Sequence, residues 1–494
     1  MSTGNGTGFI DHEAITGWLE APPPERGRLR EILDRAREAR GLEPDEVAAL
    51  VASDDPDLWA EVFTAAREVK EAIYGRRLVL FAPLYISNHC VNDCRYCGYR
   101  VSNRTLPRRK LTPDEIREEV LVLEAMGHKR LALETGEHPT ECPTTYVVEA
   151  IQTIYETSSR DGRGEIRRVN VNVAATTVED YRLLREVGIG TYVLFQETYH
   201  RPTYEVMHPS GPKSDYLWHL EAMDRAMEAG IDDVGVGVLF GLHDWRFEVL
   251  ALLLHARHLD RVWGVGPHTI SVPRLRPAAG VDLREFPHVV SDDDFRRIVA
   301  VLRLAVPYTG MILSTRERPG FRDEVFGLGI SQISAGSCTG VGGYREEAMR
   351  SARGGMEDDA GAGRPPGTGH GGGAGDEAGA GQFAVEDHRS PDEIIRSLAE
   401  SGYIPSYCTA CYRRGRTGER FMELAKTGRI RELCLPNAIL TFKEYLLDYA
   451  SPATRAAGER AIAEHLREIP NEAVRAETVR RLARLEAGER DLYL

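Results

Sequence analysis

Residues 81–100 of the 494-residue chain read FAPLYISNHCVNDCRYCGYR, an apolar, strand-like run followed by closely spaced cysteines. Cys90, Cys94 and Cys97 have the spacing C-x3-C-x2-C. Three thiolates can hold three corners of a cubane iron–sulfur cluster, which normally has four cysteine ligands. The fourth iron then lacks a protein ligand and can be chelated by another molecule. The stretch therefore predicts an iron–sulfur cluster with one open iron.

A structural zinc site is the alternative for these cysteines. Zinc sites usually combine pairs such as C-x2-C with a second pair elsewhere, which gives four protein ligands. A compact triplet without an obvious fourth ligand fits zinc poorly, and it fits a disulfide poorly as well. We therefore favour the cluster over zinc or unreactive thiols.

The composition is typical of a globular enzyme with a substantial core, because 42% of the residues are hydrophobic and 28% are charged. The formal net charge of −14 argues against a nucleic-acid partner. No apolar run reaches the roughly 18–20 residues that span a bilayer, and the opening MSTGNGTG lacks the layout of a signal peptide. We expect a cytoplasmic protein without a membrane partner, in which the isolated Cys142 and Cys338 are packed thiols.

Short β-rich runs alternate with amphipathic helical segments from residue 77 onward. Eight runs have this character: 77–81, 130–133, 168–173, 191–195, 234–240, 269–272, 311–314 and 332–334. Because crossover helices usually join parallel strands, the alternation predicts an α/β fold with a complete (β/α)8 TIM barrel. One connecting helix is expected to begin at Thr112, which is followed by a first-turn proline and early acids.

Polar residues follow several of these runs directly. Catalytic groups of such barrels lie just past the carboxyl ends of the strands. The segments in these positions are the cysteine triplet itself, Glu134-Thr135-Gly136-Glu137, Asn172, Gln196-Glu197-Thr198 and Ser314-Thr315-Arg316-Glu317. We therefore expect one active site at this end of the barrel.

The regions beside the barrel complete a four-part division of the chain. Residues 1–76 are expected to form a helical cover, because apolar residues recur at three- and four-residue spacing. The barrel is assigned to residues 77–350. Residues 351–381 are rich in Gly and Ala and predict a flexible insertion. Residues 382–494 are assigned to a mostly helical C-terminal domain.

A second cysteine triplet lies in this C-terminal domain. Cys408, Cys411 and Cys434 have the spacing C-x2-C-x22-C, again without an obvious fourth ligand. A zinc site completed by a remote histidine is an alternative here. Two sets of three cysteines indicate two clusters, each with an iron open to a ligand from outside the protein.

Several segments closely resemble the HydG family of radical S-adenosylmethionine (SAM) tyrosine lyases, which mature the active site of iron–iron hydrogenases. They include APLYISN at 82–88, GHKRLALE at 127–134, RVNVN at 168–172, LFQETYH at 194–200, GPHTISVPR at 266–274 and CTACYR at 408–413. The C-terminal triplet is the distinguishing feature. The tyrosine lyase of thiamine synthesis and the tryptophan lyases of thiopeptide synthesis look similar over the barrel but lack that region.

The resemblance implies cofactors, a reaction and partners. A 4Fe-4S cluster binds SAM at its open iron, and its electron cleaves SAM to a 5′-deoxyadenosyl radical. L-tyrosine then loses a hydrogen from its amine and breaks at Cα–Cβ into p-cresol and dehydroglycine, which yields carbon monoxide and cyanide. A second, auxiliary cluster (4Fe-4S, or 5Fe-4S with an extra iron) binds a free cysteine and assembles an Fe(CO)2(CN) unit for the hydrogenase. Expected partners are an electron donor such as ferredoxin or flavodoxin, and the maturases HydE and HydF.

The resemblance also implies roles for single residues of this chain. At the SAM site, Tyr96 packs on adenine, Thr135, Gly136 and Glu137 form the turn that binds the SAM amino group, and Asn172 and Glu197 contact SAM. Arg316, with Ser314, matches the clamp for the tyrosine carboxylate, a role suited to the guanidinium fork. His268 matches the ligand of the extra iron, beside Cys408, Cys411 and Cys434.

Other interpretations of these residues and of the chain remain open at this point. Arg316 could pair with Glu317 or Glu197, His268 could be a structural histidine, and Asn172 could end a strand in a turn. A lyase of another pathway, such as a thiamine-type 2-iminoacetate synthase, is the alternative enzyme. A non-catalytic carrier of iron–sulfur clusters is the alternative from a different class.

Overall fold

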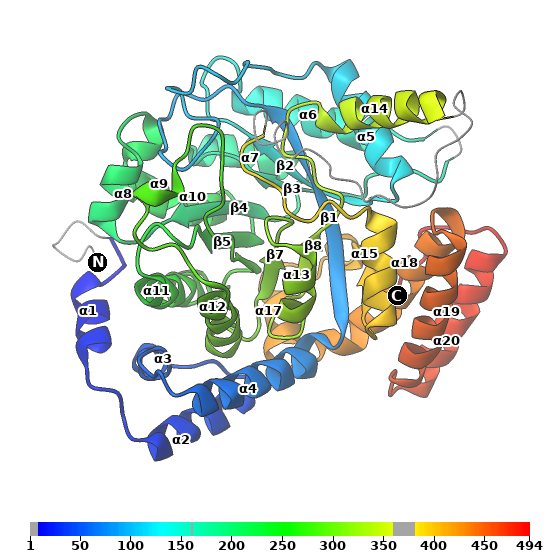
Figure 1. The fold of residues 1–494 in the computed structure, drawn as a ribbon. Helices are drawn as coiled ribbons and strands as arrows, with labels where there is room; N and C mark the ends of the chain where they lie inside the picture. The colour runs from blue at the N-terminus through cyan, green and yellow to red at the C-terminus, as the bar shows by residue number, and fades with distance from the viewer. Residues whose placement is uncertain (1–7, 160–161, 359–380) are drawn as a thin grey trace.

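A closed parallel barrel forms the centre of the molecule (Figure 1) in the computed structural model, which describes residues 8–159, 162–358 and 381–494. The strands are β1 (Arg77–Ser87), β2 (Arg130–Thr135), β3 (Arg168–Asn172), β4 (Tyr192–Glu197), β5 (Val234–Val238), β6 (Thr269–Ser271), β7 (Gly310–Leu313) and β8 (Gln332–Ser334). They pair in chain order, and β1 closes the ring by pairing with both β2 and β8. The predicted eight-stranded barrel is confirmed.

Helices cover the outside of the barrel, so the strands are buried on both faces and are rich in Val, Leu and Ile. The covering helices are α5 (Pro113–Ala125), α6 (Thr144–Glu156), α7 (Val178–Glu186), α8 (Arg201–Met207), α9 (Tyr216–Leu220), α10 (Ala222–Glu228), α11 (Trp245–Trp263), α12 (Asp292–Ala305) and α13 (Pro319–Phe326), with short 3-10 turns η1 (Pro212–Ser214) and η2 (Leu283–Glu285). The start predicted at Thr112 is a capping box: its side chain accepts from Glu115 N–H, and Glu115 accepts from Thr112 N–H.

The N-terminal helices lie at the end of the barrel where the strands begin (Figure 1). They are α1 (His12–Glu20), α2 (Arg26–Arg37), α3 (Pro44–Val51) and α4 (Pro56–Tyr74). Helix α4 packs against α12, while α1 and α3 pack against α11. A helical cover is therefore present in this part of the chain. No helix among the described residues has both the length and the apolar character needed to cross a membrane.

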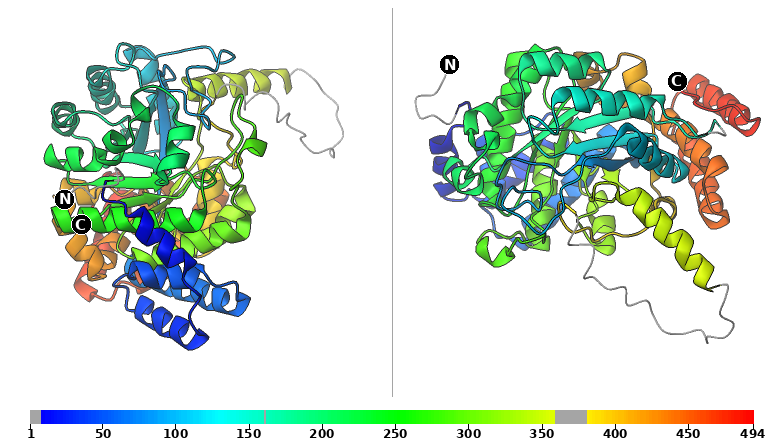
Figure 2. Two further views of the ribbon diagram at one scale, coloured as in Figure 1. Left: turned by 90° about the vertical axis from the view of Figure 1, so that its left-hand side faces the viewer. Right: turned by 90° about the horizontal axis from the view of Figure 1, so that it is seen from above.

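The C-terminal region adds helices and a ninth strand. Its elements are α14 (Gly343–Asp358), α15 (Pro391–Glu400), β9 (Ile404–Ser406), α16 (Ala410–Arg413), α17 (Gly418–Lys426), α18 (Ile430–Asp448), α19 (Pro452–Arg467) and α20 (Glu472–Glu486). Helix α14 projects away from the barrel (Figure 2) and continues to Asp358, so the first residues of the predicted insertion are helical. The remainder of that insertion, residues 359–380, lies outside the described residues.

Strand β9 was not predicted, and it determines where the second cysteine triplet lies. It pairs in parallel with the first residues of β1, with Arg77 opposite Ile404 and Val79 opposite Ser406. Cys408 therefore follows at the amino-terminal end of the barrel strands. The first triplet follows the far end of β1. The two triplets thus lie at opposite ends of one barrel.

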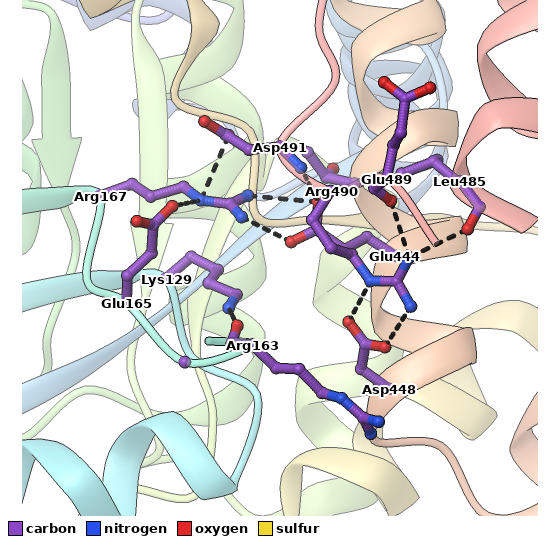
Figure 3. A network of polar contacts seen from close by, with 12 residues as sticks. Lys129, Arg163, Glu165, Arg167, Glu444, Asp448, Leu485, Glu489, Arg490 and Asp491 are labelled. Atoms are coloured by element: carbon purple, nitrogen blue, oxygen red, sulfur yellow. Dashed lines mark hydrogen bonds and ion pairs between the residues drawn. The ribbon is translucent and has the colours of Figure 1, made fainter. Parts of the chain in front are cut away.

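A buried polar network fastens α18 and the last residues of the chain to the barrel. Figure 3 shows Arg167, just before β3, directed toward Glu444 of α18 and toward Asp491. Arg490 binds both oxygens of Asp448 at 2.6 Å. These contacts fix the helix that carries Cys434 against the barrel.

Candidate functional site

A cavity of about 220 Å³ lies at the carboxyl ends of the barrel strands. Cys90, Cys94 and Cys97 form part of its wall. All eight residues predicted from sequence to bind SAM or substrate line the same cavity: Tyr96, Thr135, Gly136, Glu137, Asn172, Glu197, Ser314 and Arg316. The structure therefore brings the first triplet and these residues together in one site.

The loop that carries the first triplet is held by backbone contacts from both sides. The guanidinium of Arg108 donates to the carbonyl oxygens of four loop residues: Asn88, Tyr99, Arg100 and Asn103. Gly136 lies so close to the loop that an added Cβ would come within 2.3 Å of the His89 carbonyl oxygen. The Asn92 amide also donates to the Glu137 carboxylate at 2.5 Å. The predicted Gly136–Glu137 turn is thus packed directly against the cysteine loop.

The thiols of this loop have the chemistry that a cluster requires. Burial raises the pKa of the Cys97 thiol to about 11 and raises the pKa of Cys94 as well. Such thiols ionise when a metal ion replaces the proton, because the metal supplies the positive charge that the buried site lacks. The cavity between them offers room for a group larger than a single ion. A cubane cluster therefore fits these residues.

Tyr96 is held in the wall of the cavity by two neighbours. Its hydroxyl lies 2.8 Å from Nε2 of His208, and the two rings meet edge to face. Lys213 lies on the other side, with Nζ 5.9 Å from the centre of the Tyr96 ring. The aromatic face is therefore fixed at the edge of the cavity, where it offers a stacking surface to a bound base.

Lys213 is a site residue that the sequence analysis missed. Its ammonium forms an ion pair with Glu197 at 2.7 Å, and both side chains are largely buried, with exposed fractions of 16% and 12%. Glu197 has a positive φ of 68° at a bulge between β4 and β5. A non-glycine residue in this conformation is strained, which is common at functional sites. No motif in the sequence around Lys213 marks it.

Arg316 does not form either of the ion pairs considered as alternatives. Glu317 instead binds Arg274 and Arg276, and Glu197 binds Lys213. Among the side chains that the structure describes, no carboxylate is paired with Arg316, and its Nε has no hydrogen-bond partner. Its guanidinium carbon, Cζ, lies over the Phe383 ring, 3.4 Å from the ring centre. A cation in the cavity wall is therefore available to an anionic ligand.

Asn172 lines the cavity at the end of β3, beside Glu134. Burial raises the pKa of Glu134 to about 8, against the opposing effects of a hydrogen bond from Asn172 and the charge of Arg316. Near neutral pH this carboxyl is therefore mostly protonated. It can donate a hydrogen bond and does not neutralise Arg316.

A second, smaller cavity of about 50 Å³ lies at the opposite end of the barrel. It is lined by all three cysteines of the second triplet and by His268, together with residues from the starts of the strands: Arg77, Arg130, Gly310 and Gln332. The predicted grouping of His268 with Cys408, Cys411 and Cys434 is present.

Cys434 is the thiol of the second triplet whose pKa is lowered, whereas the pKa values of Cys408 and Cys411 are raised. A hydrogen bond from the Cys411 thiol lowers the pKa of Cys434, and the positive charges of Arg77 and Arg416 act in the same direction. Oδ1 of Asp233 lies 3.2 Å from Nδ1 of the His268 ring, which is an ion-pair distance without hydrogen-bond geometry. This contact leaves Nε2 as the ring nitrogen available to a metal.

Neither triplet surrounds a single-ion position. Throughout the described part of the chain, no group of three or more His, Cys, Asp or Glu side chains is arranged to hold one metal ion. Each triplet instead lines a cavity. Buried thiols around an open volume are suited to a multi-iron cluster, and the residues at both ends of the barrel fit such a group.

Comparison with known proteins agrees with this arrangement. Residues 84–254 match the model of the radical SAM superfamily, and residues 271–404 match the biotin and thiamin synthesis associated domain. A crystal structure of HydG, a maturase of the FeFe-hydrogenase, is 58% identical and superposes with a TM-score of 0.89 over 98% of this chain and 100% of that chain. This chain belongs to the HydG family. It is therefore a radical SAM enzyme, and this family implies a 4Fe-4S cluster and SAM.

Two further relatives place this HydG-family chain more finely. HydG from Carboxydothermus hydrogenoformans is 38% identical, with a TM-score of 0.75 over 95% of this chain and 96% of that chain. The 2-iminoacetate synthase of Salmonella typhimurium is 32% identical over 69% of this chain and 87% of its own length. The second match corresponds to the alternative enzyme, but its similarity is lower and covers less of this chain than the HydG matches. The recognition from sequence and the radical SAM barrel fold are confirmed.

Proposed function

We propose that this HydG-family enzyme is a radical SAM tyrosine lyase. It cleaves the Cα–Cβ bond of L-tyrosine to p-cresol and dehydroglycine, and it converts dehydroglycine to carbon monoxide and cyanide for an Fe(CO)2(CN) unit of the hydrogenase H-cluster. The observation that carries the proposal is the unpaired Arg316 guanidinium in the same cavity as Cys90, Cys94 and Cys97. A radical lyase for an amino acid needs an anion-binding group beside its cluster.

At the first site, Cys90, Cys94 and Cys97 would hold the cluster, which would supply the electron that splits SAM into methionine and a 5′-deoxyadenosyl radical. Tyr96 provides an aromatic face for adenine. The turn at Thr135, Gly136 and Glu137 accepts the SAM amino group. Asn172 and the Glu197–Lys213 pair complete the polar wall of this half of the cavity.

The substrate half of the cavity orients tyrosine. Arg316 binds the carboxylate with its two parallel donors, and the Ser314 hydroxyl adds a third. Because Arg316 and Ser314 both hold the carboxylate, the amine of tyrosine is directed toward the SAM half of the cavity. Hydrogen abstraction needs the amine to lie close to the radical in this way. The surrounding apolar side chains, such as Leu275 and Phe383, exclude water from the radical.

The second site receives the two-carbon product. Dehydroglycine contains the atoms of one hydrogen cyanide, one carbon monoxide and one water, so its breakdown requires no oxidant. Cys408, Cys411 and Cys434 would hold the auxiliary cluster, and His268 would ligate its extra iron, which would also take up a free cysteine molecule. Arg77 and Arg130 in the cavity wall favour anionic ligands such as cyanide and cysteine.

The partners of the enzyme follow from its chemistry. Reduction of the first cluster requires an electron donor such as ferredoxin or flavodoxin. The iron-bound product is passed on in hydrogenase assembly, where HydE and HydF are the expected companions. These assignments are supported by membership of the HydG family.

Product analysis tests the proposed function. Anaerobically reconstituted enzyme is incubated with SAM, a reductant and tyrosine; p-cresol is measured by chromatography, and carbon monoxide and cyanide are measured in the same samples. All three products are expected. Dehydroglycine as the final product, without carbon monoxide, would support the thiamine-type alternative instead. Absence of SAM cleavage after reduction would support a cluster carrier.

A further inference from the structure

Residues 381–387, named the strap here, cross the mouth of the first cavity. The strap binds the loops that follow three barrel strands. Gln382 N–H donates to Thr339 O, Ala384 N–H donates to Pro277 O at 2.9 Å, and Asp387 N–H donates to Thr315 O at 3.1 Å. These three acceptors follow β8, β6 and β7 respectively. The strap is therefore fixed to the substrate side of the barrel mouth.

Two further contacts hold the strap in place. Asp387 forms an ion pair with Arg322 of α13, in which both side chains are completely buried. At the other end, Gly98 N–H of the cysteine loop donates to Gln382 O at 3.2 Å. A Cβ added to Gly98 would lie 2.9 Å from the Gly381 carbonyl oxygen, so the loop and the strap are in close backbone contact.

The side chains of the strap reach both halves of the cavity. Gln382 accepts a hydrogen bond from the Tyr85 hydroxyl at 3.0 Å, and its amide nitrogen lies 3.8 Å from Sγ of Cys97. Phe383 presents its ring to the Arg316 guanidinium at 3.4 Å. Among the described residues, no carboxylate forms an ion pair with the Arg316 side chain, so the ring is its principal support.

We propose that Phe383 is a positioning residue that makes the enzyme selective for substrates with a carboxylate. This inference rests on the proposed function, in which Arg316 binds the carboxylate of tyrosine. The ring holds the guanidinium by cation–π stacking and leaves its edge, which carries the hydrogen-bond donors, free for the substrate. A carboxylate can then bind in the plane of the guanidinium.

The Glu197 carboxylate explains why such support is needed. It exerts an attractive field on Arg316 from the same cavity. An arginine side chain has several rotatable bonds, and ordering it has an entropic cost. Without the ring, the guanidinium is free to turn toward this carboxylate, and the substrate then competes with a group of the protein.

The test compares binding of tyrosine with binding of tyramine, which has the same ring and amine but no carboxylate. Equilibrium dialysis uses the reconstituted enzyme with SAM and without reductant, so no turnover occurs. In Phe383→Leu, which keeps an apolar side chain but loses the aromatic face, the Kd for tyrosine is expected to rise about 10-fold, while the Kd for tyramine changes less than about 2-fold. Phe383→Tyr keeps the face and is expected to retain the wild-type selectivity.

A matched control and a replacement variant make the result decisive. Phe81 lines the same cavity, and no arginine of the described residues lies over its ring. Phe81→Leu is therefore expected to leave the ratio of the two Kd values unchanged. If circular dichroism shows that the Leu variant is misfolded, Phe383→Met provides the same comparison.

Equally weakened binding of tyrosine and tyramine, or unchanged binding of tyrosine, would overturn the inference. If wild-type enzyme forms p-cresol and Phe383→Leu keeps the wild-type selectivity, only this inference is refuted. If wild-type enzyme neither binds nor cleaves tyrosine, the proposed function is refuted as well.

Discussion

Arg167 and Glu444 form an almost completely buried ion pair between the barrel and α18. Their closest atoms, Nη2 and Oε1, lie 2.6 Å apart, and the exposed fractions of the two side chains are 5% and 4%. Glu165 and Asp491 lie on the other side of the same guanidinium (Figure 3). Because α18 carries Cys434, the pair connects the second cysteine site to the start of β3.

The first prediction concerns the stability that this pair provides. In Glu444→Gln, Arg167 loses its most deeply buried anionic partner, and the free energy of unfolding of the metal-free chain is expected to fall by about 3 kcal/mol. Urea denaturation measures the change. Glu459→Gln is the control, because Glu459 is 42% exposed in its pair with Lys443 and its loss is expected to cost less than about 1 kcal/mol. Equal losses in the two variants would contradict the structural role of the buried pair.

The second prediction follows from the position of the two triplets at opposite ends of the barrel. Replacement of Cys90, Cys94 or Cys97 by Ala is expected to abolish p-cresol formation. Replacement of Cys408, Cys411 or Cys434 by Ala should preserve at least part of the p-cresol while the iron–carbonyl product disappears. Infrared bands of bound carbon monoxide and cyanide report that product, and Cys142→Ala serves as the control. Equal loss of p-cresol from both sets would disprove the division into two sites.

The elements around the first site were predictable because their signals are local in sequence. Short apolar runs between amphipathic segments gave all eight barrel strands, and polar residues directly after them, such as Asn172 and Glu197, line the cavity as expected. The spacing of the cysteines in the sequence is sufficient to predict both triplets. In each case the residue lies within a few positions of a recognisable pattern.

The contacts that were missed depend on the path of the chain. Strand β9 has three residues, one of them Pro405, so neither its length nor its composition distinguishes it from a loop. Lys213 reaches Glu197 only because the segment after α8 folds back over the cavity. Phe383 follows a Gly-rich segment that carries no pattern of its own. The position of the two triplets at opposite ends of the barrel likewise could not be predicted, because it depends on the pairing of β1 with β9.

The third prediction concerns Lys213 and SAM binding. In Lys213→Met, the Glu197 carboxylate loses its 2.7 Å ion pair and keeps an uncompensated charge in the cavity wall. That charge repels the carboxylate of SAM, so the Kd for SAM should rise about 10-fold, equivalent to about 1.4 kcal/mol. Equilibrium dialysis without reductant measures the Kd, and Lys213→Arg should restore part of the affinity. Lys110→Met, at a lysine that lies over Tyr146, is the control; a similar effect there would exclude a specific role for Lys213.

The fourth prediction is a pH dependence of stability that arises from Glu134. Burial raises the pKa of this carboxyl from 4.5 to about 8 in the folded chain. The neutral form of Glu134 contributes its full stabilisation at pH values below the pKa that Glu134 has in the unfolded chain. This stabilisation is lost as the pH rises through the pKa that Glu134 has in the folded chain, because the unfolded chain releases the proton first. The free energy of unfolding of Glu134→Gln minus that of wild type should therefore increase between about pH 4.5 and pH 8 and stay constant at higher pH. Urea titrations of the metal-free proteins across this range measure it, and a constant difference would show that Glu134 titrates normally.

The fifth prediction separates the extra iron of the second site from the rest of the enzyme. In His268→Ala, the second cavity keeps its three cysteines but loses its imidazole, so the protein should bind about one iron fewer per chain while p-cresol formation persists. In Asp233→Asn, the carboxylate 3.2 Å from Nδ1 is lost while the ligand itself remains, and a 10- to 100-fold weaker affinity for that iron is expected. Iron content after dialysis against a graded series of chelator concentrations, together with p-cresol yield, distinguishes the two variants. Unchanged iron content in His268→Ala would show that the histidine is not a ligand, and unchanged affinity in Asp233→Asn would show that the carboxylate does not orient it.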